Sequence, residues 1–164
     1  MCEFSQFFQV AMGTGLDAVP YPYQTAFATS ESLPSLVRVP TSAGKTATAI
    51  LGWLYRRQIA PQKTPRRLVY CLPMRTLVEQ AEREARRWIA NLQFDVPVHV
   101  LLGGAPATDW YLYPERPMVL IGTQDMLLSR ALNRGYAASR FHWVLHRFRP
   151  AQQRLPVGCL MNRS

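Results

Sequence analysis

Val39-Pro-Thr-Ser-Ala-Gly-Lys-Thr46 is the stretch of sequence that decides the fold of this chain. A short apolar run, residues 36–39, leads into it, and a stretch of helical composition, residues 47–55, follows it. A strand, a loop of small residues ending in Gly-Lys-Thr, and a helix together form the phosphate-binding P-loop. In that arrangement the backbone N–H groups at the start of the helix face an anion. The stretch therefore predicts a site for a nucleoside triphosphate.

Two side chains of this loop have predicted chemical roles. Lys45 would reach the β- and γ-phosphates, and the Thr46 hydroxyl would ligate Mg²⁺. The general pattern has Gly where this chain has Val39, so the match is partial. An ordinary strand-to-helix turn is the competing interpretation. It leaves unexplained why three small residues, 42–44, precede the only lysine among the first 62 residues.

The composition indicates one globular domain without a membrane partner. The chain has 164 residues, of which 48% are apolar and 18% charged, which suits one domain with a packed core. It contains no apolar run long enough to span a bilayer. Cys2, Cys71 and Cys159 form neither a zinc pattern nor a disulfide framework. We therefore expect a reducing, cytoplasmic location.

The net charge of the chain is +9, from 19 basic and 10 acidic residues. This charge favours a polyanionic partner such as nucleic acid. Residues 126–164 contain seven Arg and no acidic residue, so they supply +7 of the total, and residues 1–125 are nearly neutral. The basic segment either binds nucleic acid or is not native sequence.

Helical and strand-like segments alternate along the chain. The strongest helical pattern covers residues 75–92, where apolar residues recur every three or four positions and charged residues fall between them. Further helices are expected at 4–12, 24–29, 47–58 and 123–132, and strands at 36–39, 67–72, 96–102 and 118–121. This alternation predicts an α/β fold with a parallel sheet covered by helices on both faces.

Two further motifs carry polar groups suited to a nucleotide or a phosphodiester. The Gln24 side-chain amide offers a donor and an acceptor together, which could read the edge of adenine. Pro73 and Arg75 join a predicted strand to the long helix, where a cation and backbone N–H groups can hold a phosphodiester. The competing interpretations are a solvated Gln24 and a proline-started helix with a surface arginine.

The remaining motifs follow the third and fourth predicted strands. Gly103 and Gly104 expose backbone, and Thr123, followed by Gln124, offers a hydroxyl at a helix start. Turn and cap roles are equally natural for these residues. In a parallel sheet, however, ligands gather at the carboxyl ends of the strands, so all these motifs are expected at one face.

In order and spacing, the motifs resemble the first RecA-like lobe of a superfamily 2 helicase. Pro22-Tyr-Gln24 resembles the Q motif, Pro40-Thr-Ser-Ala-Gly-Lys-Thr46 motif I, and Pro73-Met-Arg-Thr-Leu77 motif Ia. Gly103-Gly104 and Thr123-Gln-Asp-Met-Leu127 resemble later nucleic-acid motifs. The chain also resembles the CRISPR-associated helicase–nuclease of type I systems, particularly its I-U (I-G) branch, in residues 20–28, 39–57, 68–80 and 122–141. This resemblance covers about residues 4–141.

The resemblance implies ATP and Mg²⁺ as cofactors, and single-stranded DNA and a CRISPR effector complex as partners. Members of this family couple ATP hydrolysis to 3′-to-5′ movement along DNA and cut it with a separate HD nuclease domain. Gln24 would contact adenine, and Thr41, Ser42, Ala43, Gly44, Lys45 and Thr46 would hold the phosphates. The DNA backbone would meet Arg75, Gly104 and Thr123, within motifs that include Pro73, Gly103 and Gln124.

The end of the chain departs from this family. No Asp-Glu pair, the family's motif II that holds Mg²⁺, occurs in the sequence, and no acidic residue follows Asp125. We therefore expect a truncated fragment: a partial ATP-binding domain at 1–141 and an aberrant Arg-rich tail at 142–164. A frameshift would explain the tail. If suitable synonymous codons are chosen for residues 149–158, the reading frame one base further on can encode a peptide that resembles the family segment just before motif II.

The fragment is expected to bind nucleotide weakly and not to hydrolyse ATP efficiently alone. Two other functions stay open. The chain could be a non-catalytic, basic nucleic-acid-binding protein that uses its Arg-rich tail. It could also be a P-loop ATPase that a partner subunit completes.

Overall fold

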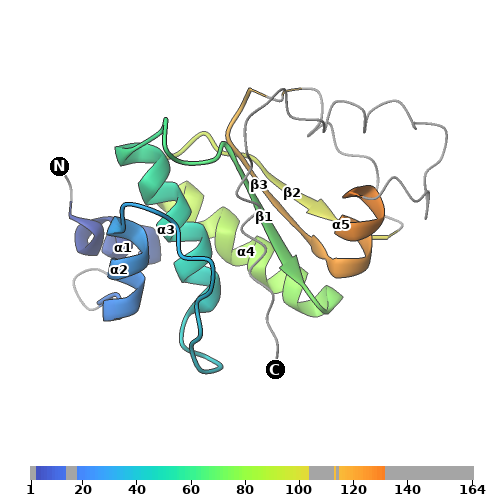
Figure 1. Cartoon of the computed structure of the whole chain (residues 1–164), viewed down its shortest axis with the longest axis horizontal. Helices are drawn as coiled ribbons and strands as arrows, with labels where there is room; N and C mark the ends of the chain where they lie inside the picture. The colour runs from blue at the N-terminus through green and yellow to red at the C-terminus, as the bar shows by residue number, and fades with distance from the viewer. Residues whose placement is uncertain (1–2, 14–17, 104–112, 114, 132–164) are drawn as a thin grey trace.

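In the computed structural model, five helices and three strands are described, over residues 3–13, 18–103, 113 and 115–131 (Figure 1). The predicted tail, residues 142–164, lies outside the described residues, so the domain boundary at 141 stays a prediction. In chain order the elements are α1 (Phe4–Met12), α2 (Pro22–Thr29), α3 (Lys45–Ile59), β1 (Arg67–Leu72), α4 (Arg75–Asn91), β2 (Val98–Leu101), β3 (Met118–Thr123) and α5 (Gln124–Ala131).

The three strands form one parallel sheet in the order β1-β3-β2. Leu72 of β1 pairs with Thr123 of β3, and Leu101 of β2 pairs with Gly122. The three strands therefore end at one edge of the sheet, which we call the carboxyl edge. A Cβ atom on Gly122 would lie 2.7 Å from the Leu101 carbonyl oxygen, so only glycine fits this close approach of the two strands.

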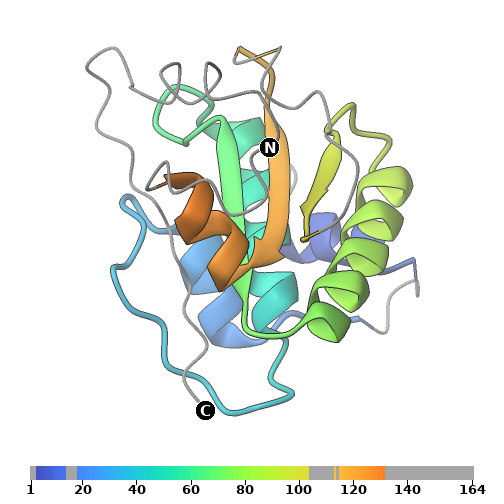
Figure 2. The same cartoon turned by 90° about the vertical axis from the view of Figure 1, so that its right-hand side faces the viewer.

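Helices cover both faces of the sheet, as the sequence predicts (Figure 2). Successive strand side chains point to opposite faces. On one face Tyr70 and Ile121 belong to the main core, which also includes buried residues of α1, α2, α3 and α4. On the other face Met118 and Leu120 form a smaller cluster, against which Leu127 of α5 packs.

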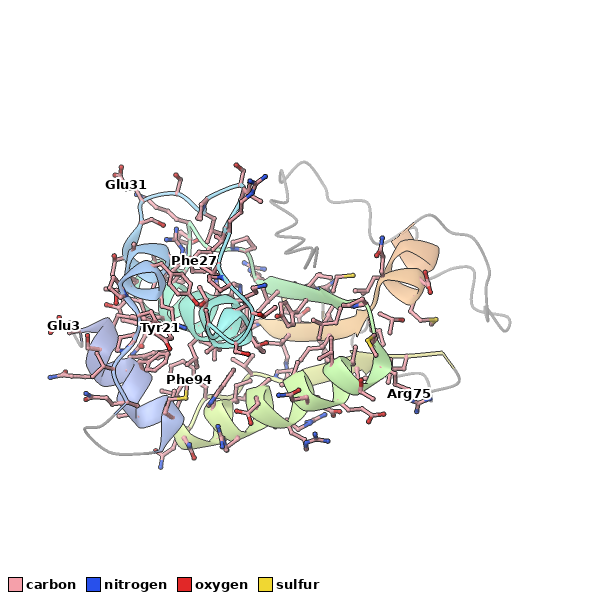
Figure 3. The ribbon with its side chains drawn as sticks, turned by 90° about the horizontal axis from the view of Figure 1, so that it is seen from below. Glu3, Tyr21, Phe27, Glu31, Arg75 and Phe94 are labelled. Atoms are coloured by element: carbon pink, nitrogen blue, oxygen red, sulfur yellow. The ribbon has the colours of Figure 1, made fainter. Side chains whose placement is uncertain are left out.

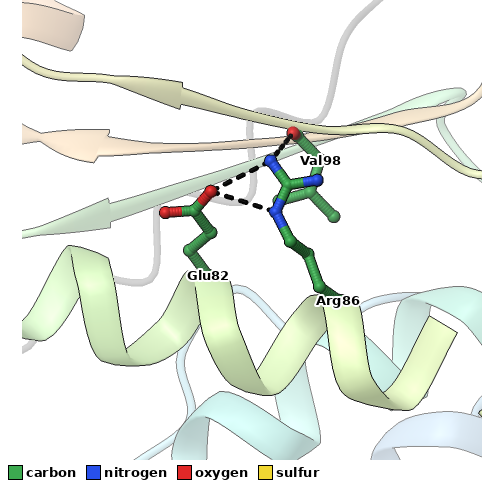
Figure 4. A network of polar contacts seen from close by, with 3 residues as sticks. All are labelled: Glu82, Arg86 and Val98. Carbon is green, nitrogen blue, oxygen red and sulfur yellow. Dashed lines mark hydrogen bonds and ion pairs between the residues drawn. The ribbon is translucent and has the colours of Figure 1, made fainter. Parts of the chain in front are cut away.

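Helix α4 confirms the strongest pattern in the sequence. Its buried side chains recur at helical spacing, at Val78, Ala81, Ala85, Trp88 and Ile89. Arg86 pairs with Glu82 one turn earlier, with Nε 3.0 Å from Oε1, and donates to the Val98 carbonyl oxygen at 2.9 Å (Figure 4). The charged face of α4 thus also fastens the start of β2.

Helix α1 adds an aromatic layer to the core. The Phe4 and Phe7 rings both meet Tyr55 of α3, at 5.2 and 5.3 Å between ring centroids. Gly13 ends the helix with φ +69°, and the Asn91 side-chain amide donates to the Ala11 carbonyl oxygen at 2.8 Å. The end of α1 is therefore tied to the end of α4.

The predicted strand at residues 36–39 is wrong. The residues have no regular secondary structure and form no ladder with any described strand, and Leu36 is 65% exposed. A short apolar run becomes a strand only where a neighbour supplies hydrogen bonds and an apolar face. In the described part of the chain β1 pairs on one side only, with β3, and residues 36–39 do not join it on the other.

The other boundaries shift by a few residues. Helix α2 begins at Pro22 instead of 24, and α3 begins at Lys45 instead of 47. Strand β2 is shorter than the predicted 96–102, and β3 continues to Thr123, which sequence analysis assigned to the next helix. Within the described residues, no helix has the length and apolar character needed to cross a membrane.

Candidate nucleotide loop and nucleic-acid edge

The loop before α3 has the backbone of an anion site. Helix α3 begins at Lys45, and its N-cap residue, Gly44, is left-handed at φ +76° with no side-chain cap. Ser42 is also left-handed, at φ +65°, a conformation that residues other than glycine rarely adopt. The first N–H groups of a helix have no carbonyl partner within it, and its dipole is positive there. This helix start therefore suits a phosphate.

Gln24 lies directly behind this loop. Its side chain is 2% exposed, and Oε1 accepts a hydrogen bond from the Tyr21 backbone N–H at 2.9 Å. Nε2 donates to the Gly44 carbonyl oxygen and to Thr48 Oγ1, both at 3.1 Å. Both Nε2 protons are thus bonded to protein atoms, so donation from Gln24 to adenine requires exchange of one of these two bonds.

Tyr23 and Thr48 complete this support, and sequence analysis missed both. The Tyr23 hydroxyl donates to the Ala43 carbonyl oxygen. Thr48 Oγ1 lies 3.1 Å from the Tyr23 hydroxyl and 2.9 Å from the Gly44 carbonyl oxygen. We call Tyr23, Gln24 and Thr48 the anchoring cluster. Two features of the sequence could have identified them: Tyr23 is next to Gln24, and Thr48 lies one helical turn after Gly44.

Two glycines let α2 approach α3 closely enough for these bonds. A Cβ atom on Gly44 would lie 2.8 Å from Gln24 Nε2, and one on Gly52 would lie 2.6 Å from Phe27 Cδ1. Figure 3 shows Tyr21 and Phe27 of this segment beside α3. The fit of α2 on α3 therefore depends on the missing side chains of both glycines.

A buried arginine fastens the end of α2 to the same helix. Arg56 of α3 is almost fully buried, and its guanidinium donates to the Ser30 carbonyl oxygen and, at 3.4 Å, to that of Glu31. Burial lowers the pKa of Arg56. Arginine still stays protonated in proteins, so this contact is a charge-assisted clamp on the segment that leads to the loop.

Lys45 and Thr46 open α3 and are both half-buried. Thr46 Oγ1 lies 3.2 Å from the Tyr70 hydroxyl of β1. Burial raises the pKa of Tyr70, and its hydrogen bond with Thr46 opposes that rise. The loop residues Thr41 and Ser42 are exposed. A hydroxyl and a lysine at an uncapped helix start fit a triphosphate with Mg²⁺.

The predicted nucleic-acid residues gather at the carboxyl edge. Pro73 and Arg75 follow β1, Gly103 follows β2, and Thr123 ends β3 just before Gln124. The strand register brings these positions to one edge, as predicted. Gly104 lies outside the described residues. The predicted sites are thus grouped, although the roles of the individual residues stay predictions.

Arg75 is the most accessible cation of this set. Its side chain is 69% exposed, and its Nε lies 3.1 Å from Glu79 Oε1 on the next turn of α4 (Figure 3). Such an exposed pair contributes little to stability, so exchanging Glu79 for a phosphate costs little.

One hollow in the described structure lies away from this edge. A hollow of about 330 Å³ lies at the start of β2 and β3, lined by Phe94, Asp95, Val96, Pro97, Arg116 and Pro117. The described residues contain no cluster of three or more His, Cys, Asp or Glu side chains that could hold a metal ion.

A parallel sheet with helices on both faces and a Gly-Lys-Thr loop before α3 are the features of a partial RecA-like domain. Residues 21–145 match the family model described as "DEAD/DEAH box helicase". The chain belongs to this DEAD/DEAH box helicase family.

The solved structures include a protein of similar fold, the yeast DEAD-box splicing factor Prp28. The match has a TM-score of 0.55 and 19% sequence identity, and covers 76% of this chain. It covers 31% of the Prp28 chain, so this chain spans about a third of that length. At this identity the likeness shows the fold. No curated protein sequence matches the chain.

Proposed function

We propose that this chain binds ATP and Mg²⁺ at residues 41–46. The observation that carries the proposal is the preformed loop: an uncapped helix start with left-handed Ser42 and Gly44, held from behind by the anchoring cluster. Family membership supports it, because residues 21–145 include the loop and its supports.

The residues of the loop divide the proposed work. The backbone of Thr41, Ser42, Ala43 and Gly44 surrounds the phosphates, and Lys45 neutralises the β- and γ-phosphates. The Thr46 hydroxyl ligates Mg²⁺, which neutralises charge on the phosphates when bound. Gln24 reaches the adenine edge only after releasing one of its present partners.

Hydrolysis by these residues alone is expected to be slow. Activation of water in this enzyme class needs carboxylates that hold Mg²⁺, and the 164 residues contain no Asp-Glu pair. Nucleotide binding without efficient turnover is therefore the proposed activity of these 164 residues.

We further propose that the carboxyl edge contacts the backbone of single-stranded DNA. Arg75, Gly103, Gly104 and Thr123, with neighbouring Pro73 and Gln124, would make these contacts, since backbone amides, hydroxyls and arginine bind phosphate. The sequence resemblance favours the CRISPR-associated helicase–nucleases of type I systems, acting in the cytoplasm with an effector complex. In that family, movement along DNA and DNA cleavage are activities of the full-length enzyme.

The decisive test compares the two lysines of the chain by titration with a fluorescent ATP analogue. Lys45→Ala is expected to weaken binding at least tenfold, because it removes the cation at the phosphates. Lys63→Ala, at an exposed turn, removes the same charge away from the loop and is expected to leave binding unchanged. Equal binding by both variants, or no binding by the unmodified chain, would contradict the proposal.

The charge distribution favours a second function, non-catalytic nucleic-acid binding. Residues 126–164 supply +7 of the net charge of +9. DNA binding that persists in Lys45→Ala but disappears on deletion of residues 142–164 would favour this alternative. Binding that depends on Arg75 instead supports the carboxyl edge.

A further inference from the structure

Tyr70 is a buried polar group beside the nucleotide loop that the proposed function does not use. It lies in β1, paired with Ile121 of β3, and its side chain is 5% exposed. Its hydroxyl lies 3.2 Å from Thr46 Oγ1, and either oxygen could be the donor. Because the ring is buried and its backbone is paired with β3, the phenol oxygen is a fixed point next to the start of α3.

The position of one proton decides what this contact does. A threonine hydroxyl has one proton and two lone pairs. If Thr46 ligates a cation with a lone pair, its proton must point away from the cation, toward an acceptor. The Tyr70 oxygen is such an acceptor within hydrogen-bond distance. If Tyr70 were the donor, it would occupy one of the two lone pairs of Thr46 and leave the Thr46 proton without this acceptor.

We propose that Tyr70 is a positioning residue: its hydroxyl accepts the Thr46 proton and so turns a Thr46 lone pair toward Mg²⁺ bound with the nucleotide. This inference rests on the proposed nucleotide site and adds a residue to it. Tyr70 itself touches neither nucleotide nor cation in this arrangement. Its effect is therefore on the affinity for Mg²⁺, not on the affinity for the nucleotide alone.

Burial is consistent with this role. A tyrosine phenol is neutral at physiological pH without any shift. Burial raises the pKa of Tyr70, and its hydrogen bond with Thr46 opposes that rise. A neutral phenol oxygen can accept the Thr46 proton without adding a negative charge beside the phosphates.

The test is a Mg²⁺ titration of binding of a fluorescent ATP analogue to the full 164-residue chain. In Tyr70→Phe, which keeps the ring and removes the oxygen, the Mg²⁺ concentration for half-maximal enhancement should rise about three- to tenfold, the range of one hydrogen bond. Binding measured in EDTA should stay within about twofold, since the backbone contacts remain. Tyr113→Phe, at an exposed tyrosine, is the matched control and should change neither value.

A double substitution separates positioning from general damage. In a Thr46→Val background the hydroxyl is absent, so adding Tyr70→Phe should cause no further change in Mg²⁺ dependence. An unchanged or stronger Mg²⁺ effect in Tyr70→Phe alone overturns the inference and leaves nucleotide binding standing. An unmodified chain that binds no nucleotide overturns the proposed function, and the positioning role with it.

A second measurement needs no variant. The Thr46 methyl signal in NMR reports the χ1 rotamer through its three-bond couplings. If Tyr70 already orients the hydroxyl, the couplings should be the same before and after the nucleotide and Mg²⁺ are added. A change of rotamer on adding Mg²⁺ would mean that the hydroxyl leaves Tyr70, which overturns the inference even if Tyr70→Phe does not fold.

Discussion

The nucleotide loop and the carboxyl edge of the sheet hold their polar groups in opposite ways. Behind the loop, Gln24 and Thr48 are buried and bonded to each other and to the backbone of Gly44. At the carboxyl edge, Pro73 and Gln124 are exposed, and Arg75 pairs with Glu79 on its own helix. Binding at the loop should therefore depend on a prearranged backbone, and binding at the edge on accessible charge.

The difference follows from what each ligand needs. A triphosphate is recognised by several N–H groups that must point to one place, so the loop has to be fixed before binding. A phosphodiester backbone is a long line of charges that mobile cations and exposed amides can follow. The effects of substitutions in the anchoring cluster should therefore not depend on salt concentration. Substitutions at the carboxyl edge should change the salt dependence of nucleic-acid binding.

Gly44→Ala should produce the largest effect. It places a side chain at φ +76° and 2.8 Å from Gln24 Nε2, so the backbone is strained and the Gln24 amide must move. We expect a loss of about 1–3 kcal/mol of stability in urea unfolding and more than tenfold weaker binding of an ATP analogue. Gly103→Ala is the control, because its Cβ would meet only Met126 Sδ at 3.8 Å. Similar nucleotide affinity in both variants would contradict a preformed loop.

Gln24→Leu should have the next largest effect. The change leaves the Tyr21 N–H without its acceptor and removes the donor to Thr48 and Gly44, and a buried unsatisfied group costs about 1–3 kcal/mol. Thermal unfolding should show this loss equally at low and high salt. Gln80→Leu, at an exposed position of α4, serves as the control. If the two variants lost the same stability, the anchoring cluster would have no special role.

Arg75→Ala tests the other side of the comparison. Removal of one phosphate contact should weaken binding of single-stranded DNA by a few fold and lower the slope of log affinity against log salt by about 1. ATP-analogue binding should not change. Arg83→Ala removes the same charge from an exposed site two turns along α4. A DNA affinity that falls equally in both variants would indicate general charge attraction instead of a site.

Glu82→Gln should have the smallest effect. It weakens an exposed pair with Arg86 on the surface of α4, worth about 0.3–0.5 kcal/mol. Urea unfolding at low salt should show this loss, and high salt should remove most of it. A larger loss that persists in salt would mean that the bond from Arg86 to Val98 also depends on Glu82 (Figure 4).

Much of the fold could be predicted because local patterns and final packing agree. The apolar spacing in α4, the bounds of α1 and β1, and the gathering of motifs at the carboxyl edge all follow from sequence. Residues 36–39 could not be predicted in the same way, because strand formation depends on a neighbour that the pattern of those four residues does not describe. The sequence predicted an element well where one face of that element carries the apolar residues. It did not predict whether a short apolar segment pairs with a neighbouring strand.

The site shows the same limit. The Gly-Lys-Thr loop was predictable from its neighbours in sequence, but two of the three side chains that hold it, Tyr23 and Gln24, come from α2, 20 residues earlier. The contact of Gln24 with adenine stays a prediction, and the bonds of its amide to the loop could not be read from the sequence. Tyr70 lies 24 residues after Thr46, and only the packing of α3 on β1 brings the two hydroxyls together.

The central claim is that the start of α3 is a preformed anion site. Backbone amide NMR of the full chain during a titration with pyrophosphate tests it most directly. We predict that the largest shifts fall on the amides of Gly44, Lys45 and Thr46, saturate together, and are lost in Lys45→Ala. Shifts confined to the arginines of residues 126–164, or an absence of shifts at the start of α3, would contradict the claim.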